Sequence, residues 1–145
     1  MATERSAQAT WQGDLMSGSG EIHEVPSGAF GPLQVTWASR AEEEHGGKSS
    51  PEELIAAAHA ACFAMAFSNE LAKAGHAPER LETSATVTFV PGTGITKSAL
   101  TVVGSVPGID DAAFEEIAEQ AKNGCPVSGA LKGNAELTLD ARLQN

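Results

Sequence analysis

Residues 50–75 read SPEELIAAAHAACFAMAFSNELAKAG, and this stretch predicts one long helix. Ser50 is a favoured N-cap residue, and Glu53 follows it at the spacing of a capping box. Pro51 suits the first helical position. The helix should therefore run from Pro51 to about Ala74, where a glycine follows and a proline stands shortly beyond.

The side chains of this predicted helix are mostly small and apolar. Between Glu53 and Glu70 it is rich in alanine and nearly uncharged. A helix that is apolar on most sides has to be covered on most sides. We therefore expect it at the centre of the fold, where its alanines would let another helix approach closely.

The residues before the helix indicate short strands. Residues 7–11, 21–25 and 33–39 each have strand character and are separated by turn residues, which predicts an antiparallel meander. Residues 41–50 are polar, contain a glycine pair and have no apolar period, so they are predicted to form a loop.

The residues after the helix combine a hairpin with two more helices. The predicted elements, in order, are strands 81–90 and 95–106, a helix capped by Asp110 or Asp111 and stopped by Gly124, a short helix that begins at Cys125-Pro126, and a strand over 135–143. Hairpins and helices mix without a regular βαβ alternation. The fold class is therefore α+β, with antiparallel sheets packed around the long central helix.

Length and charge exclude several classes of protein. The 145 residues suit one compact domain over residues 1–145. The formal net charge of −10 should repel nucleic acids and anionic membranes. The first residues lack the apolar core of a signal peptide, and no later stretch is expected to approach the roughly 20 apolar residues of a membrane span. A cytoplasmic protein without membrane or nucleic-acid partners is expected.

The two cysteines are the main candidates for chemistry, because such a pair in a reducing compartment is either reactive or simply buried. Cys62 lies within the apolar helix, where a buried, inert thiol is the ordinary interpretation. Cys125 stands at a helix start, where free amides and the helix dipole favour a thiolate. From the residues alone, Cys125 is the better nucleophile, with an unreactive N-cap cysteine as the alternative.

Two long motifs resemble the OsmC/Ohr family of hydroperoxide reductases. Residues 50–63, SPEELIAAAHAACF, resemble the signature of the family's central helix, and residues 125–128, CPVS, resemble its second signature. Further similarities are found at residues 11–14 (WQGD), at Arg40 and at residues 106–110 (VPGID). The first motif and the WQGD start are closer to the osmotically inducible OsmC branch than to the Ohr branch.

The resemblance implies a thiol peroxidase that reduces organic hydroperoxides, and hydrogen peroxide less efficiently. It implies that Cys62 attacks the peroxide, that Cys125 resolves the resulting sulfenic acid as a disulfide, and that Arg40 and Glu52 organise the site. The residue types suit this chemistry, since a permanent guanidinium charge favours a thiolate and a carboxylate can hold the guanidinium. No metal ion or organic cofactor is expected.

The spacing of Glu52 and Cys62 has a consequence for assembly. Ten residues along one helix separate two positions by about 15 Å. If both serve one site, they come from two subunits whose central helices run antiparallel in a two-fold dimer. The resemblance likewise implies an intertwined homodimer.

The partners of the reaction are expected to be a hydroperoxide and a thiol reductant. An apolar site wall would favour a peroxide with an apolar tail, and the expected wall residues are Ile55, Phe63, Met65 and Phe67. The resemblance implies a dithiol reductant such as a lipoyl-bearing protein.

Two other functions compete with a peroxidase. His59 precedes Cys62 by three residues and so lies on nearly the same helix face, which permits a cysteine hydrolase or acyl transferase, although a packing role for His59 is favoured. The alternative from another class is a non-catalytic stress protein that binds a small apolar ligand between subunits. Neither alternative needs a second cysteine at a helix start, and the histidines are too scattered for a zinc site.

Overall fold

The computed structural model describes residues 1–145, which fold as two compact units, Met1–Pro51 and Glu52–Asn145. Each unit has its own three-stranded sheet. The expectation of an α+β fold with a long helix is confirmed. That residues 1–145 act as one domain stays a prediction.

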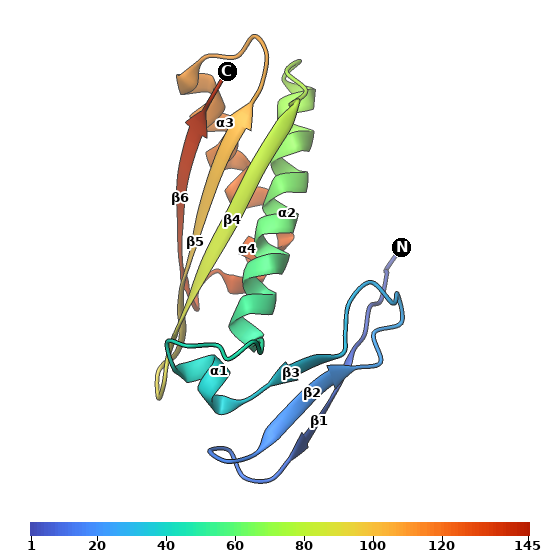
Figure 1. Ribbon diagram of the computed structural model, residues 1–145. Coiled ribbons are helices and arrows are strands. Elements are labelled where there is room, and N and C mark those ends of the chain that lie inside the picture. Colours follow the sequence, from blue (N-terminus) through green and yellow to red (C-terminus); the bar gives the residue numbers. More distant parts are fainter. The chain divides into compact units, whose positions relative to one another are not determined.

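The N-terminal unit is a meander followed by a short helix (Figure 1). Strands β1 (Gln8–Gln12), β2 (Ser19–His23) and β3 (Leu33–Val35) pair antiparallel in the order β1-β2-β3. Helix α1 (Trp37–Ala41) comes next. The predicted antiparallel meander is confirmed, with boundaries that differ by a few residues.

Helix α1 was not expected, because residues 33–39 were predicted to be one strand. The strand ends at Val35, and Thr36 begins a helix with a complete capping box. The Thr36 hydroxyl accepts from the Ser39 amide at 3.1 Å, and the Ser39 hydroxyl accepts from the Thr36 amide at 2.9 Å. These two hydrogen bonds satisfy backbone donors at the start of the helix, so the local capping box outweighs the strand alternation here.

The WQGD segment has a structural role in this unit. The Trp11 indole donates to the Gly13 carbonyl at 3.0 Å and packs over Gly20. A Cβ atom at Gly20 would lie 2.6 Å from the indole carbon Cε3, which is closer than side-chain carbons approach. Trp11 and Gly20, directly opposite in the β1-β2 register, therefore fit together because one of them has no side chain.

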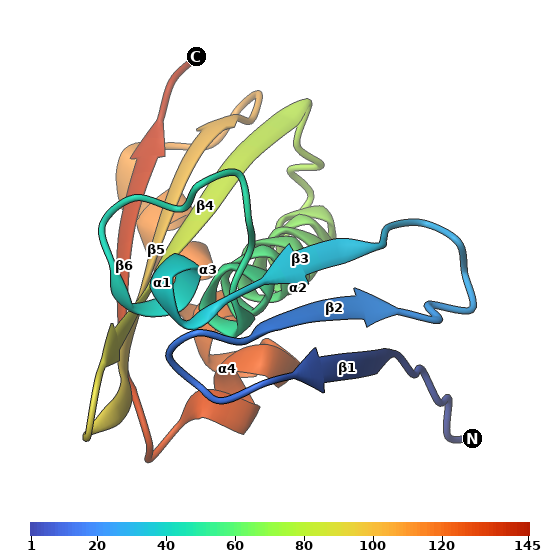
Figure 2. The ribbon, with the colours of Figure 1, turned by 60° about the horizontal axis from the view of Figure 1, so that its bottom comes forward.

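The C-terminal unit packs three helices on one face of a sheet (Figures 1 and 2). Its elements are α2 (Pro51–Lys73), β4 (Arg80–Val90), β5 (Gly94–Ser105), α3 (Asp111–Gly124), α4 (Pro126–Leu131) and β6 (Glu136–Leu143). Helix α2 starts at the predicted residue and ends one residue earlier than predicted. The predicted hairpin, the cap of α3 by Asp110 and the short helix after Cys125 are confirmed.

Local chemistry explains where α2 ends. Gly75 adopts a left-handed conformation with φ of +86°, which glycine tolerates best. The His76 amide donates to the Leu71 carbonyl at 2.8 Å, and the Gly75 amide donates to the Ala72 carbonyl at 3.0 Å. These paired bonds form a Schellman motif, which satisfies the last carbonyls of the helix.

One strand pairing differs from the expectation of antiparallel sheets. Strands β4 and β5 pair antiparallel, but β5 and β6 pair parallel, so the sheet is mixed. The physical reason is the connection: α3 and α4 carry the chain back to the end at which β5 begins. A crossover of this length produces a parallel neighbour, whereas a tight turn produces an antiparallel one.

The core of the C-terminal unit is aromatic and aliphatic, and it includes a cysteine. Its buried side chains come from α2, β5, α3 and the junction before α4, and they include Phe63, Phe67, Leu71, Leu100, Val102, Phe114, Ala118, Ala121 and Cys125. The rings of Phe67 and Phe114 lie 5.0 Å apart between centroids. Cys125 is 1% exposed, so its thiol belongs to this core.

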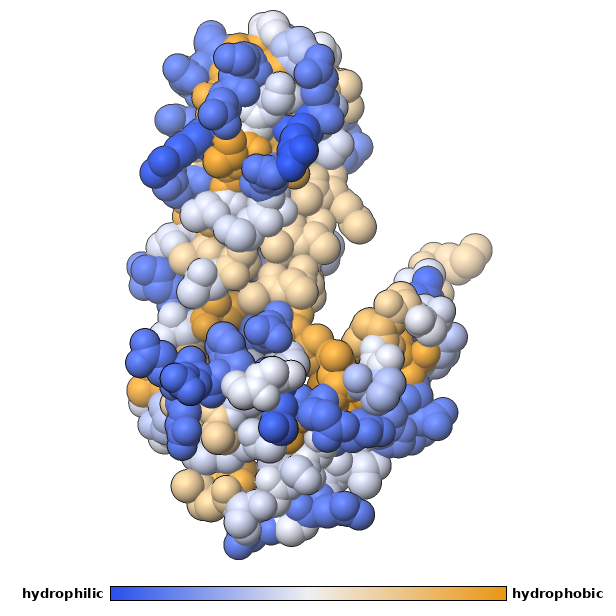
Figure 3. All heavy atoms as spheres, viewed as in Figure 1, coloured by the Kyte–Doolittle hydropathy of each residue, from blue (hydrophilic) through white to orange (hydrophobic).

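The opposite face of α2 is much less covered. By length and composition alone α2 could cross a membrane, and 22% of that apolar window is buried. The prediction that no stretch approaches this length was too strict for α2, although core helices of soluble proteins also pass the test. The exposed positions include Ala57, Ala58, Ala61 and Met65, the last 74% exposed. Figure 3 shows apolar side chains gathered along this helix.

Candidate active site

The two cysteine sulfurs lie next to each other in the C-terminal unit. Their Sγ atoms are 2.9 Å apart, although the residues are 63 positions apart in the chain. Both thiols are free. A disulfide bond needs a sulfur separation of about 2.05 Å, so a shift of about 1 Å would close it. The pair is therefore arranged for reversible disulfide chemistry.

Three elements bring the sulfurs together. Cys62 lies in the middle of α2, and Cys125 is the N-cap of α4. The Cys125 amide donates to the Ala121 carbonyl at 2.9 Å, which fixes the junction between α3 and α4. Pro126 then starts α4 at its favoured first position. Cys62 is partly exposed and Cys125 is buried, so of the two sulfurs Cys62 is the more accessible to a substrate.

Burial raises the pKa of the Cys62 thiol above its ordinary value, and the neighbouring Cys125 sulfur adds to the rise. A hydrogen bond from the Val127 backbone amide acts in the opposite direction and lowers this pKa. Val127 lies in the first turn of α4, so a free amide at that helix start acts on Cys62. The sequence argument had assigned their effect to Cys125.

His59 is completely buried, and both of its ring nitrogens are engaged. Its Nδ1 atom lies 2.6 Å from the Ser98 hydroxyl on β5, and its Nε2 atom lies 2.8 Å from the Ser128 hydroxyl on α4. Burial lowers the pKa of His59, which keeps the imidazole neutral. A ring whose nitrogens both contact serines is poorly placed to deprotonate Cys62, so the hydrolase hypothesis loses its base.

Arg40 lies in α1 of the N-terminal unit, in the last turn of that helix. It lines a hollow of about 360 Å³ together with Trp11, Leu15 and Trp37. The hollow combines apolar walls with one permanent positive charge. Such a site suits a small molecule with an apolar body and a polar group. That Arg40 acts on Cys62 stays a prediction.

Glu52 is buried, with 6% of its surface exposed, in the first turn of α2. Charged carboxylates are rarely buried unless they are paired. Its position ten residues before Cys62 puts it about 15 Å away along the helix axis. The two residues therefore do not meet within one helix, and the role expected of Glu52 stays a prediction.

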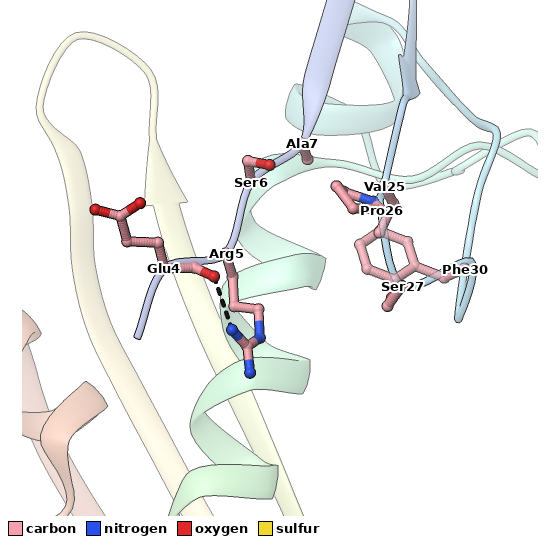
Figure 4. Close-up of a pocket in the computed structure, with 8 residues that line it drawn as sticks. All are labelled: Glu4, Arg5, Ser6, Ala7, Val25, Pro26, Ser27 and Phe30. Carbon is pink, nitrogen blue, oxygen red and sulfur yellow. Dashed lines mark hydrogen bonds between the residues drawn. The ribbon is translucent and has the colours of Figure 1, made fainter. Parts of the chain in front are cut away.

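A larger hollow in the N-terminal unit carries less chemistry. It measures about 750 Å³ and is lined by residues that include Arg5, Val25, Pro26 and Phe30 (Figure 4). The Arg5 guanidinium donates to the Glu4 carbonyl at 2.7 Å. None of the residues drawn in Figure 4 is a cysteine or a histidine, so this hollow offers neither a thiol nor an imidazole.

Two of the expected wall residues do not line an open site. Phe63 and Phe67 are 0% exposed and stack on each other with ring centroids 5.5 Å apart. Both belong to the core, because α2 turns this face toward the sheet and α3. Met65 is exposed and Ile55 is partly buried, so these two remain available for apolar contacts.

Sequence reasoning missed three groups around the sulfurs, namely the Ser98 hydroxyl, the Ser128 hydroxyl and the Val127 amide. Ser128 stood within the CPVS motif, which was a signal that could have been followed. Ser98 is one serine in an ordinary strand and gives no such signal. A backbone amide has no signature in the sequence at all, because every residue except proline carries one.

The chain is similar in sequence to one protein family and to individual known proteins. The model of the family described as OsmC-like protein matches residues 44–140. Over its whole length the chain is 43% identical to peroxiredoxin OsmC of Escherichia coli (strain K12), and the alignment of 148 residues covers all of both proteins. It is 32% identical over 99 residues to an organic hydroperoxide resistance protein of Xanthomonas axonopodis pv. citri, covering 65% of this chain and 67% of the relative.

Solved structures show the same fold. An organic hydroperoxide resistance protein from Elizabethkingia anophelis, crystallised with thiocyanate bound, superposes with a TM-score of 0.72 at 23% identity. The match covers 99% of this chain and 100% of that protein. At this level of identity the likeness shows the fold alone.

Proposed function

Because this chain belongs to the family of OsmC-like proteins, we propose that its peroxidase activity in stress defence uses Cys62 as the peroxide-attacking thiol and Cys125 as its disulfide partner. The single observation that carries this proposal is the distance of 2.9 Å between the two free sulfurs. The exposure of the two thiols supports the order of the steps, since the more accessible sulfur is the one that must meet the substrate.

The proposed reaction consumes one hydroperoxide and oxidises two thiols to a disulfide. The Cys62 thiolate attacks the distal oxygen of the hydroperoxide, so an S–O bond forms while the O–O bond breaks. The alkoxide leaves, takes up a proton and becomes the alcohol. The Cys125 thiol then attacks the sulfenic acid: the S–S bond forms, the S–O bond breaks, and hydroxide leaves with a proton as water. Two electrons have passed from the sulfurs to the peroxide.

The raised pKa of Cys62 creates a need for positive charge. We assign this role to Arg40, whose guanidinium would stabilise both the thiolate and the departing alkoxide, and we assign to Glu52 the role of holding that guanidinium. The Val127 amide contributes in the same direction as Arg40. The burial of Glu52 supports the assignment, because a buried carboxylate is expected to have a cationic partner.

The expected substrate is an organic hydroperoxide, with hydrogen peroxide as a poorer one. One relative is named an organic hydroperoxide resistance protein, and the apolar hollow at Arg40 suits a peroxide with an apolar tail. A dithiol, for which a lipoyl-bearing protein is a candidate, would reduce the disulfide and release both thiols. The reducing cytoplasm is the compartment in which such a cycle would run.

The working form is proposed to be a homodimer. Most of the apolar window of α2 is not buried within the chain, and its alanines would let a second copy of the helix approach closely. In a two-fold dimer with antiparallel α2 helices, Glu52 of one subunit would lie near Cys62 of the other. Each of the two sites would then need residues from both subunits.

Mass spectrometry tests the two thiol roles. Brief treatment of the reduced protein with one equivalent of an alkyl hydroperoxide should lower its mass by two hydrogens. Cys62→Ser should abolish peroxide consumption, because a serine hydroxyl cannot cycle through a sulfenic acid. With one equivalent Cys125→Ser should still be oxidised to the sulfenic acid, and a second equivalent of the hydroperoxide should carry it on to the sulfinic acid. If Cys125→Ser blocks the first oxidation and Cys62→Ser spares it, the two roles are reversed.

Subunit mixing tests the shared site. Cys62→Ser and Glu52→Ala should each be inactive as homodimers. In a mixed dimer, one site combines the intact Cys62 of one subunit with the intact Glu52 of its partner. Random reassortment after mild unfolding yields about half mixed dimers, so activity should return to about a quarter of the wild-type level. Mixed dimers that form but stay inactive would exclude the shared site.

A further inference from the structure

The contacts of His59 lie directly beside the contact between the sulfurs. His59 precedes Cys62 by three residues on α2, and Ser128 follows Cys125 by three residues on α4. Residues three apart on a helix are neighbours on one face. The His59–Ser128 contact of 2.8 Å and the Cys62–Cys125 contact of 2.9 Å therefore form two adjacent links between the same two helices.

A neutral imidazole is well suited to a position between two serine hydroxyls. It carries one donor and one acceptor nitrogen, and a serine hydroxyl can serve either of them. Ser98 is 0% exposed and Ser128 is 2% exposed, so water does not compete for these bonds. Buried hydrogen bonds are directional and costly to leave unmade. His59 thus ties α4 to β5 through a fixed geometry that apolar packing alone would not impose.

Helix α4 needs such a tie, because it is only six residues long. A helix of this length has little stability of its own, so tertiary contacts set its position. Its N-cap Cys125 makes no side-chain capping bond, since the sulfur faces Cys62 instead. A contact at Ser128, one turn further along α4, is therefore well placed to hold the Cys125 sulfur in register.

We propose that His59 is a positioning residue, which holds α4 through Ser128 so that the Cys125 sulfur stays within reach of Cys62 for the disulfide step. This inference rests on the proposed roles of the two cysteines. The step itself is the attack of the Cys125 thiol on the Cys62 sulfenic acid, which forms the disulfide and releases water. His59 neither touches the peroxide nor exchanges a proton in it.

The test measures the lifetime of the sulfenic acid after one equivalent of an alkyl hydroperoxide. Samples are quenched over time, the sulfenic acid is trapped with a dione reagent, and the disulfide is identified by the loss of two hydrogens. Ser128→Ala removes the contact on α4 and should lengthen the lifetime about ten- to a hundredfold, the usual consequence of a misplacement near 1 Å. When a second equivalent of the hydroperoxide is added, the share of protein that is oxidised to the sulfinic acid should rise with this lifetime.

Thr83→Val is the matched control. The Thr83 hydroxyl also ties α2 to the sheet, through a 3.0 Å bond to the Ala60 carbonyl, but this bond does not involve α4. Its loss should leave the sulfenic acid lifetime within about twofold of wild type, because a merely structural effect on α2 does not move Cys125. Equal lifetimes in Ser128→Ala and Thr83→Val would overturn the proposal.

A second pair of variants covers the case in which Ser128→Ala fails to fold, as judged by circular dichroism. His59→Gln keeps a donor and an acceptor, whereas His59→Met has nearly the same length but no donor and only a weak sulfur acceptor. Slow disulfide formation in His59→Met with recovery in His59→Gln supports the proposal, and equal rates in the two overturn it. Wild-type protein that forms no disulfide would instead refute the cysteine roles, and the inference with them.

Discussion

The two units of this protein differ in whether they bury a cluster of aromatic side chains. In the C-terminal unit Phe63, Phe67 and Phe114 are fully buried. In the N-terminal unit Met16 is 74% exposed and Phe30 is 48% exposed. The C-terminal unit closes its own core and leaves apolar surface along α2, whereas the N-terminal unit contributes no side chain to the buried apolar core, so burial against another surface would stabilise it.

The groups proposed to take part in the reaction are also divided between the two units. The C-terminal unit holds both sulfurs, His59 and the Val127 amide, and its burial raises the pKa of Cys62. The N-terminal unit holds Arg40, the cation proposed to lower that pKa again. A buried core suits disulfide closure between two thiols but does not favour a thiolate, so we expect the stabilising charge to come from outside that core.

The largest expected effect is on the free energy of unfolding, and the same substitution, Phe to Ala, should affect the two units very differently. Phe67→Ala should lower the free energy of unfolding by about 3–5 kcal/mol, because it opens a cavity between α2 and α3. Phe30→Ala should change it by about 0.5 kcal/mol or less, since half of that ring already faces water. Urea unfolding of both variants measures the difference. Similar losses in the free energy of unfolding would mean that the N-terminal unit also has a stabilising core, around Phe30.

The next effect concerns the division of the chemistry. Arg40→Met should raise the pKa of Cys62 further and slow peroxide consumption at neutral pH about ten- to a hundredfold, as expected for the loss of a charge-assisted hydrogen bond. Arg40→Lys should recover little, because a point charge does not replace the planar guanidinium. The pH profile of thiol alkylation gives the pKa directly. An unchanged profile in Arg40→Met would confine the chemistry to the C-terminal unit.

A smaller effect has opposite signs in the two units. Gly20→Ala should destabilise the protein by about 1–3 kcal/mol, because its Cβ atom would lie 2.6 Å from the Trp11 ring. Gly129→Ala, in α4, meets nothing within 4 Å and should stabilise by about 0.5–1 kcal/mol through helix propensity. Thermal unfolding of the two variants gives the signs. Stabilisation by Gly20→Ala would show that the indole is free to move aside.

The smallest effect is a pH dependence that belongs to the C-terminal unit. Burial lowers the pKa of His59 below its ordinary value of 6.5, so the unfolded chain binds a proton at a higher pH than the folded one. The neutral, buried His59 therefore contributes to folding stability above pH 6.5, and this contribution is lost as the pH falls below 6.5. Urea unfolding at about pH 7.5 and about pH 5.5 should show that the free energy of unfolding falls less on acidification in His59→Gln than in wild type. Equal losses would assign the pH dependence to other groups.

Local signals were enough to predict much of the fold. The N-cap, the first-position proline and the glycine after the helix gave α2 to within one residue. The turn residues 91–94 gave the β4-β5 hairpin. These features depend on groups only a few residues apart, so the sequence displays them directly. Helix α1 was missed because a five-residue helix in a stretch that also alternates like a strand offers two competing patterns.

Long-range features were beyond local reasoning. The parallel pairing of β5 and β6 depends on where α3 and α4 return the chain. The family resemblance predicted the partnership of Cys62 and Cys125, whereas local reasoning left both the inert and the reactive interpretations open. The fold gives that pair a separation of 2.9 Å, while the catalytic roles stay predictions.

By itself, the sequence determined the long helix, the hairpin, the fold class and the family, because caps, turns and motifs are written in neighbouring residues. Only the tertiary structure decided that His59 lies between Ser98 and Ser128, which are 39 and 69 positions further along the chain. It also decided that the Val127 amide at the start of α4 acts on Cys62. The physical reason is that hydrogen bonds act over about 3 Å in space, and only the packing of helices against the sheet brings such distant residues that close.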